Sequence, residues 1–217
     1  MLISYEDEKN RRQVPKVKDY LSAKKYCDYM YCYLQVMSVF DEDSKERYLL
    51  KKNVNFSQIG RDLQVSRQTA STKFKNLISI GLLTEKEDRY ILVNLDKEIA
   101  ELIPFSTLRI LTNTVKENVI SVYIYLLVRY RAEQQKPFLF TFTQIKKYVG
   151  IGESRGTDYI ISDILLVLKK LDLLDYITNT EVVNGGVKTI YQVVSMNNKI
   201  DNPQDIEIKF GWNIIGC

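Results

Sequence analysis

The chain has 217 residues, of which 45% are hydrophobic and 27% are charged, and its formal net charge is +4. This balance is typical of a globular protein and excludes disordered and fibrous classes. No apolar run approaches the roughly 20 residues that span a bilayer, and the polar N-terminus does not resemble a secretory signal peptide. We therefore expect a cytoplasmic protein with no membrane partner.

The composition also argues against an enzyme. The chain contains no histidine, which is the commonest general base and the commonest zinc ligand. Its three cysteines, Cys27, Cys32 and Cys217, form no Cys-x-x-Cys pair, so we expect reduced thiols. Glycine-rich phosphate loops and Gly-x-Ser-x-Gly elbows are absent. The sequence therefore predicts no catalytic residue, no metal and no cofactor.

The first half of the chain predicts one small domain over residues 24–95, preceded by a charged, frayed arm over residues 1–23. In chain order the domain holds a long helix over 26–40, a strand over 48–54, a short helix after an N-cap at Ser57, a turn over 64–66, a helix from Arg67 to about Ile80, and a hairpin over 82–93. Ser66 is the expected N-cap of the longer helix, and Gly81 is its expected left-handed C-terminal cap.

The second half repeats this order. Residues 96–116, which include Pro104, predict an ordered connector because a flexible linker would be richer in Gly and Ser. A second domain over 117–196 then holds a helix over 117–130, a strand over 137–142, a short helix after Thr143, a helix over 158–171, and a hairpin with its turn at Asn184-Gly185-Gly186. Residues 197–217 form a tail that predicts an extra strand or a docking segment.

The two halves match at a constant offset in each helix, but the second turn is five residues longer, within residues 152–156. Helix, strand, helix, turn, helix, hairpin is the order of a winged-helix domain. The predicted fold is therefore mostly α with small β-hairpins (α+β), as two winged-helix domains in tandem.

Positive charge is concentrated in residues 51–80, where Asp62 is the single acid. The six basic residues are Lys51, Lys52, Arg61, Arg67, Lys73 and Lys75. Such a field attracts phosphates, although a solvated helical face is an alternative. The helix from Arg67 has an apolar stripe for the core and no acid, as a helix that enters the major groove requires.

The outward side chains of this helix are the candidate base-reading residues, since arginine suits guanine and glutamine suits adenine. They are Arg67, Gln68, Ser71, Thr72 and Lys75. A second set is predicted to contact phosphates: Lys73, Arg61, Ser57, Lys86, Arg89 and, in the second domain, Arg155. The equivalent helix of the second domain carries Asp158 and Asp163, which repel phosphates. Packing against the first copy or a second chain is its expected role, and a homodimer is one possibility.

Two stretches resemble known families. "FSQIGRDLQVSRQTASTKFKNLISIGLL" resembles the helix-turn-helix of bacterial winged-helix proteins. "LIPFSTLRILTNTVKENVISVYIYLLVRYRAEQQKPFLFTFTQIKKYVGI" is similar to replication-initiation and replisome-organiser proteins of phages and plasmids, including the DnaD-like group. The resemblance implies binding of double-stranded DNA near an origin and recruitment of replication proteins, such as a helicase loader or primase. A winged-helix transcriptional regulator and a protein–protein assembly module without DNA binding stay open as alternatives.

Overall fold

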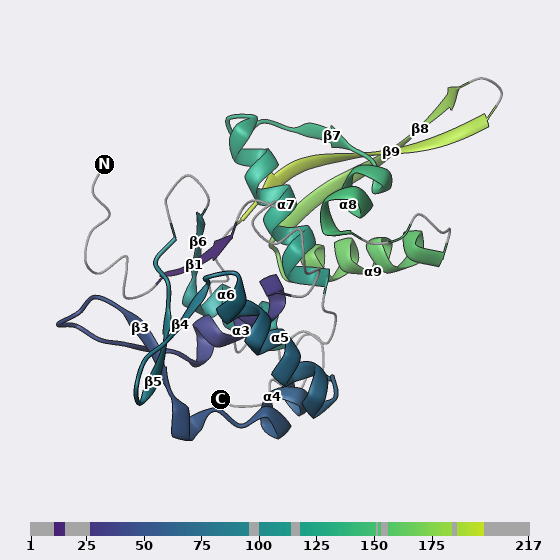
Figure 1. Ribbon diagram of the computed structural model, residues 1–217. Helices are drawn as coiled ribbons and strands as arrows, with labels where there is room; N and C mark the ends of the chain where they lie inside the picture. Colours follow the sequence, from purple (N-terminus) through teal and green to yellow (C-terminus); the bar gives the residue numbers. More distant parts are fainter. Residues whose placement is uncertain are drawn as a thin grey trace. The chain divides into compact units, whose positions relative to one another are not determined.

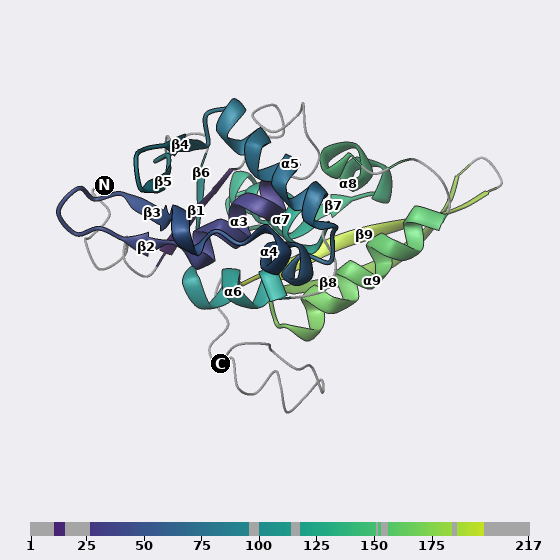
Figure 2. The same cartoon turned by 60° about the horizontal axis from the view of Figure 1, so that its bottom comes forward.

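The computed structural model describes residues 11–15, 27–95, 100–113, 118–150, 152, 156–183 and 186–197. These residues divide into two compact units, residues 11–113 and residues 118–197. Each unit combines helices with a small antiparallel sheet, which confirms the predicted α+β class. The units are described separately below (Figures 1 and 2).

The first unit is built around helix α3 (Cys27–Met37), which packs against helices α5 (Arg67–Ser79) and α6 (Phe105–Asn113) and against strands β1 (Arg11–Pro15) and β3 (Arg47–Leu50). Every residue from 29 to 35 is buried, so α3 is a core helix on all sides. Two of its tyrosine hydroxyls donate to backbone carbonyls: Tyr29 to Thr112 at 2.9 Å and Tyr31 to Val93 at 3.2 Å. The predicted helix is three residues too long, because Val39–Phe40 form strand β2 instead.

The larger of the two sheets in this unit has the order β2-β3-β5-β4, with all neighbours antiparallel. The predicted hairpin is confirmed as β4 (Leu83–Glu85) and β5 (Arg89–Leu92). The predicted strand over 48–54 is shorter than expected. It ends at Leu50, and a 3-10 turn over Lys51–Asn53 leads into helix α4 (Phe56–Asp62).

The N-terminal arm is not frayed over its whole length. Strand β1 pairs antiparallel with β6 (Ala100–Pro104), and Val14 is fully buried. Arg12 is also buried, and its Nε donates to the Gln35 carbonyl at 3.2 Å while its guanidinium lies 4.5 Å from the Phe105 ring centre. This desolvation, with the nearby charge of Arg47, lowers the pKa of Arg12 to about 10. The arm and the connector therefore complete the first unit, and the connector forms one strand and one helix, β6 and α6.

The second unit has helix α7 at its centre, with residues 119–127 all buried. Helices α8 and α9 and strand β9 pack against α7. The elements are α7 (Asn118–Ala132), β7 (Phe138–Phe140), α8 (Phe142–Val149), α9 (Gly156–Lys170), β8 (Leu174–Val183) and β9 (Gly186–Met196). The far part of the β8–β9 hairpin extends beyond the other elements of the unit in both ribbon views (Figures 1 and 2).

The two units share the order helix, strand, short helix, longer helix, hairpin. In each, the strand before the short helix pairs with the second strand of the hairpin, giving β3-β5-β4 in the first unit and β7-β9-β8 in the second. The predicted repeat of element order is therefore present in the structure. Parts of the longer second turn, the hairpin residues Asn184 and Gly185, and the tail after residue 197 lie outside the described residues.

Candidate nucleic-acid interface

Helices α4 and α5 are joined by a tight turn whose geometry is set by Gly60 and Gln64. Gln64 adopts a left-handed backbone with φ 53°, and the Val65 N–H donates to the Gly60 carbonyl at 2.8 Å. A Cβ at Gly60 would lie only 2.8 Å from the Val65 carbonyl oxygen, so this close approach requires glycine. Ser66 caps α5 as predicted, accepting from the Thr69 N–H at 3.0 Å.

The outward face of α5 is polar, carries no acid and is accessible to a binding partner. Arg67, Gln68, Thr72 and Lys75 are exposed, and Ser71 is half-buried. Within the described part of the chain, none of these five side chains has a hydrogen bond or ion pair. The opposite face holds the fully buried residues Ala70, Phe74 and Leu77. The structure therefore brings the five predicted base-reading residues together on one exposed surface, which we call the α5 face.

Lys73 does not belong to the α5 face. Its side chain is only 7% exposed and is engaged within the protein, so the prediction that it supports phosphate binding is wrong. The reason is helical spacing: position 73 follows Ala70 by three residues and precedes Leu77 by four, which places it on the core stripe. Long lysine side chains can bury their aliphatic stem in such positions.

Arg61 lies at the end of a chain of hydrogen bonds on α4. The Tyr33 hydroxyl donates to Asp62 Oδ2, the Gln58 amide donates to Asp62 Oδ1, and Arg61 donates to Gln58 Oε1, each at 2.6 Å. Asp62 is therefore occupied by two donors, and the exposed guanidinium of Arg61 is oriented by Gln58. Burial raises the pKa of Tyr33, and the hydrogen bond to Asp62 and its charge raise it further.

Both short helices begin two residues earlier than predicted. Asn55, not Ser57, caps α4: its side chain accepts from the N–H groups of Ser57 and Gln58 at 2.9 and 3.2 Å. Ser57 is exposed in the first turn of α4. In the second unit Thr141, not Thr143, caps α8 in a capping box with Gln144. The sequence signal was present in both places, since each cap precedes a glutamine by three residues.

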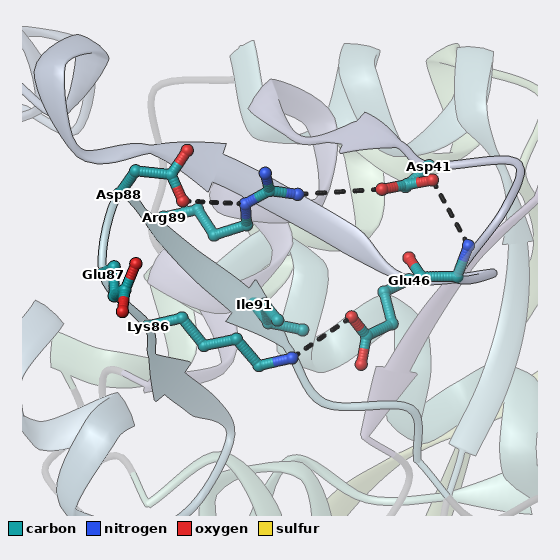
Figure 3. Close-up of a pocket in the computed structure, with 8 residues that line it drawn as sticks. Asp41, Glu46, Lys86, Glu87, Asp88, Arg89 and Ile91 are labelled. Carbon is teal, nitrogen blue, oxygen red and sulfur yellow. Dashed lines mark hydrogen bonds and ion pairs between the residues drawn. The ribbon is translucent and has the colours of Figure 1, made fainter.

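The β4–β5 hairpin carries Lys86 and Arg89, but both face acids (Figure 3). Arg89 lies 3.0 Å from Asp88 and 3.7 Å from Asp41, and Lys86 lies 3.7 Å from Glu46. These groups line a shallow pocket of about 550 Å³ between the β2–β3 loop and the hairpin. The guanidinium of Arg89 also stacks 4.7 Å above the centre of the Tyr48 ring.

The electrostatics of this pocket leave little positive charge for DNA. The Ser44 and Asp43 N–H groups lower the pKa of Asp41, and Arg89 lowers the pKa of Asp88. In turn the hydrogen bond and charge of Asp88 raise the pKa of Arg89. With Glu87 also at its edge, the pocket holds more carboxylates than cations. The hairpin is therefore a weaker candidate for phosphate contact than the α5 face.

In the second unit, the positions of α9 equivalent to Arg67 and Lys75 of α5 are Asp158 and Leu166, so neither carries a cation. Lys146 is 5% exposed and its Nζ lies 2.7 Å from Asp158 Oδ1. The charge of Asp158 is therefore paired with a lysine of the same unit. Asp163 is exposed on α9. Arg155, the predicted phosphate contact of this domain, lies outside the described residues.

The described residues were also searched for metal sites and membrane-spanning helices. No group of three or more His, Cys, Asp or Glu side chains there is placed to hold a metal ion. None of the helices described is long and apolar enough to cross a membrane. Comparisons of the chain with protein-family models, curated proteins and solved structures gave no match. The function is therefore inferred from the geometry and charge of the chain itself.

Proposed function

We propose that the chain binds double-stranded DNA through the α5 face of a winged helix formed by residues 27–95. The proposal rests on one observation about α5. Its outward side chains are exposed hydrogen-bond donors and acceptors, the helix carries no acid, and these side chains have no partners within the described part of the chain. A helix that serves only as a solvated surface usually mixes both signs of charge.

Each side chain has a distinct role in this proposal. Arg67 and Gln68 lie in the first turn of α5, the end of a recognition helix that usually reaches base edges. Arginine donates two hydrogen bonds to guanine, and glutamine pairs with adenine in the same bidentate way. Ser71 and Thr72 are short enough to let the helix approach the groove. Lys75 and Arg61 would contact phosphates on either side.

We further propose a role at a replication origin, which the resemblance to phage and plasmid initiators favours over transcription. A regulator on the same fold would bind a promoter-proximal palindrome as a symmetric dimer. An assembly module would show no salt-dependent affinity for DNA.

The test is fluorescence-anisotropy binding to a random duplex and to the DNA upstream of the gene, across a salt series. Lys75→Ala should weaken binding to both duplexes and lower the slope of log K against log salt by about 0.9. Gln68→Ala should cost about 1–3 kcal/mol and relax one base preference in a selection from randomised duplexes. Lys136→Ala removes the same charge as Lys75→Ala from an exposed position of the second unit and is the matched control.

Two results would refute the proposal. One is the absence of binding to either duplex at low salt by the folded protein. The other is equal loss of affinity in Lys75→Ala and Lys136→Ala, because net charge alone would then explain the binding.

A further inference from the structure

Arg61 lies at the point where helix α4 meets the turn that leads into α5. Its carbonyl accepts the Gln64 N–H at 3.1 Å, and the preceding Gly60 carbonyl accepts the Val65 N–H at 2.8 Å. The backbone of Arg61 is therefore fixed by the same turn that sets the start of α5. Its guanidinium is exposed, and Gln58 is the one side chain that contacts it within the described part of the chain. The other N–H groups of the guanidinium are open to a ligand.

The hydrogen bonds behind Arg61 have a fixed direction, because Asp62 carries a carboxylate and an ionised carboxylate only accepts. Its Oδ2 accepts from the Tyr33 hydroxyl and its Oδ1 from the Gln58 amide nitrogen, each at 2.6 Å. Gln58 must therefore turn its NH2 group toward Asp62 and its oxygen away from it. That oxygen accepts from Arg61 at 2.6 Å. We call these four residues the Tyr33 network, and its inner carboxylate decides that an acceptor faces the guanidinium.

The inner end of the Tyr33 network is anchored in the core of the first unit. Tyr33 is 7% exposed, and it lies on α3 within a run, residues 29–35, that is buried throughout. Its ring cannot move without disturbing close-packed neighbours, so its hydroxyl holds Asp62 in one place. A hydrogen bond between two exposed side chains usually contributes little, because both must be ordered. Here Asp62 and Gln58 are exposed but are ordered from below by a buried donor.

We propose that Tyr33, Asp62 and Gln58 are positioning residues, which hold the Arg61 guanidinium ready for a phosphate of the DNA that contacts the α5 face. This inference rests on the proposed function and adds to it the residues that order one of its contacts. An arginine that is already ordered in the free protein loses less conformational entropy on binding than a mobile one. Asp62 is the single acid on α4 and α5. Because donors of the protein occupy both of its oxygens, it favours phosphate binding through Arg61.

The first test is a double-mutant cycle on DNA affinity, measured by fluorescence anisotropy with the same two duplexes. Gln58→Ala changes no charge, so it should leave the salt slope unchanged. It should raise Kd about two- to tenfold, the equivalent of ordering one long side chain. Arg61→Ala should raise Kd by more and lower the slope of log K against log salt by about 0.9. In the Arg61→Ala background, Gln58→Ala should have no further effect, because it acts through Arg61.

Tyr33→Phe tests the inner end of the network, because it removes the hydroxyl and keeps the ring. It should raise Kd in the parent but not in the Arg61→Ala background. Tyr31→Phe is the matched control on the same helix, since its hydroxyl donates instead to the Val93 carbonyl at 3.2 Å. It should lower the free energy of unfolding and leave the Kd of the folded protein unchanged. Arg61→Lys keeps the charge and should still lose affinity, because lysine has no planar fork that can contact Gln58 and a phosphate together.

A measurement without DNA separates this inference from the proposed function. In the free parent, NMR relaxation of the Arg61 Nε–H group should be that of an ordered side chain, and in Gln58→Ala the group should become mobile. A mobile Arg61 side chain in the parent overturns the inference even where the protein binds DNA. So do losses from Gln58→Ala and Arg61→Ala that simply add, or equal effects of Tyr33→Phe and Tyr31→Phe on Kd. A parent that binds neither duplex instead refutes the proposed function itself, and the inference falls with it, whether or not Arg61 is ordered.

Discussion

Replacing Gly60 with alanine tests whether α4 and the turn before α5 are as close as the structure indicates. The added methyl group would lie 2.8 Å from the Val65 carbonyl oxygen, 3.3 Å from the Arg67 nitrogen and 3.4 Å from the Ser66 carbonyl carbon. All three are backbone atoms, so none can rotate away as a side chain would. The two segments must separate to accept the methyl group.

The sign of the effect follows from two opposing magnitudes. Alanine favours a helix by about 1 kcal/mol relative to glycine. Forcing a methyl group into occupied space costs typically about 1–3 kcal/mol, and a contact this short with rigid backbone belongs in the upper part of that range. We therefore expect Gly60→Ala to lower the free energy of unfolding by about 1–2 kcal/mol, measured by urea denaturation. Since Arg67 follows the displaced turn directly, DNA affinity should fall as well.

Gly81 provides the comparison. Nothing lies within 4 Å of a Cβ built there, but its φ is +76°. Gly81→Ala should therefore destabilise through backbone strain alone, and Gly81→Asn should recover part of the loss because asparagine tolerates the left-handed region. At Gly60 asparagine should be worse than alanine. If Gly60→Ala instead stabilises the protein by the full helix-propensity gain, the close contact between α4 and the turn does not exist.

Three further outcomes are expected. Asn55→Ala should cost about 1 kcal/mol in urea denaturation, whereas Ser57→Ala should cost under about half of that, because Asn55 is the true cap; equal costs would contradict the assignment. Because the pKa of Tyr33 is raised in the folded protein, its contribution to stability is complete below the ordinary value of 10.0 and is lost as the pH rises above that value. Tyr33→Phe should therefore make the free energy of unfolding fall less steeply at alkaline pH. An unchanged slope would exclude this role for Tyr33. Lys73→Ala should reduce stability more than DNA affinity, whereas Lys75→Ala should reduce DNA affinity more than stability. Both quantities are measured on the same samples, by urea denaturation and by fluorescence anisotropy. Equal effects of the two variants on both quantities would contradict the assignment of Lys73 as buried and Lys75 as exposed.

The local part of the fold was predictable because it depends on interactions within a few residues. Ser66 as a cap, Gly81 in the left-handed region and the extent of α5 all follow from side-chain-to-backbone bonds and helical periodicity. The predictions of Ser57 and Thr143 as caps were wrong, although the sequence carries a signal for the true ones. The residue two positions before each of them is followed three residues later by a glutamine, which is the pattern of a capping box.

The long-range part was not predictable in this way. Strand β1 pairs with β6, which lies about 90 residues later in the chain, and no sequence pattern in either segment predicts this pairing. The pairing of Lys86 and Arg89 with acids depends on the β2–β3 loop lying beside the hairpin, which follows from the strand order. A charge count along the chain cannot show which cations are neutralised by acids that are distant in sequence.

The sequence by itself determined which side chains α5 presents to solvent, because the helical repeat and the apolar residues of its core stripe fix its orientation on α3. Tertiary structure alone decided which of the basic residues remain available. It placed Glu46 and Asp41 beside the hairpin cations Lys86 and Arg89, and it left Arg67 and Lys75 without partners within the described part of the chain. The physical reason is range: periodicity and capping act over one or two turns, whereas burial and ion pairing depend on whatever the fold brings alongside.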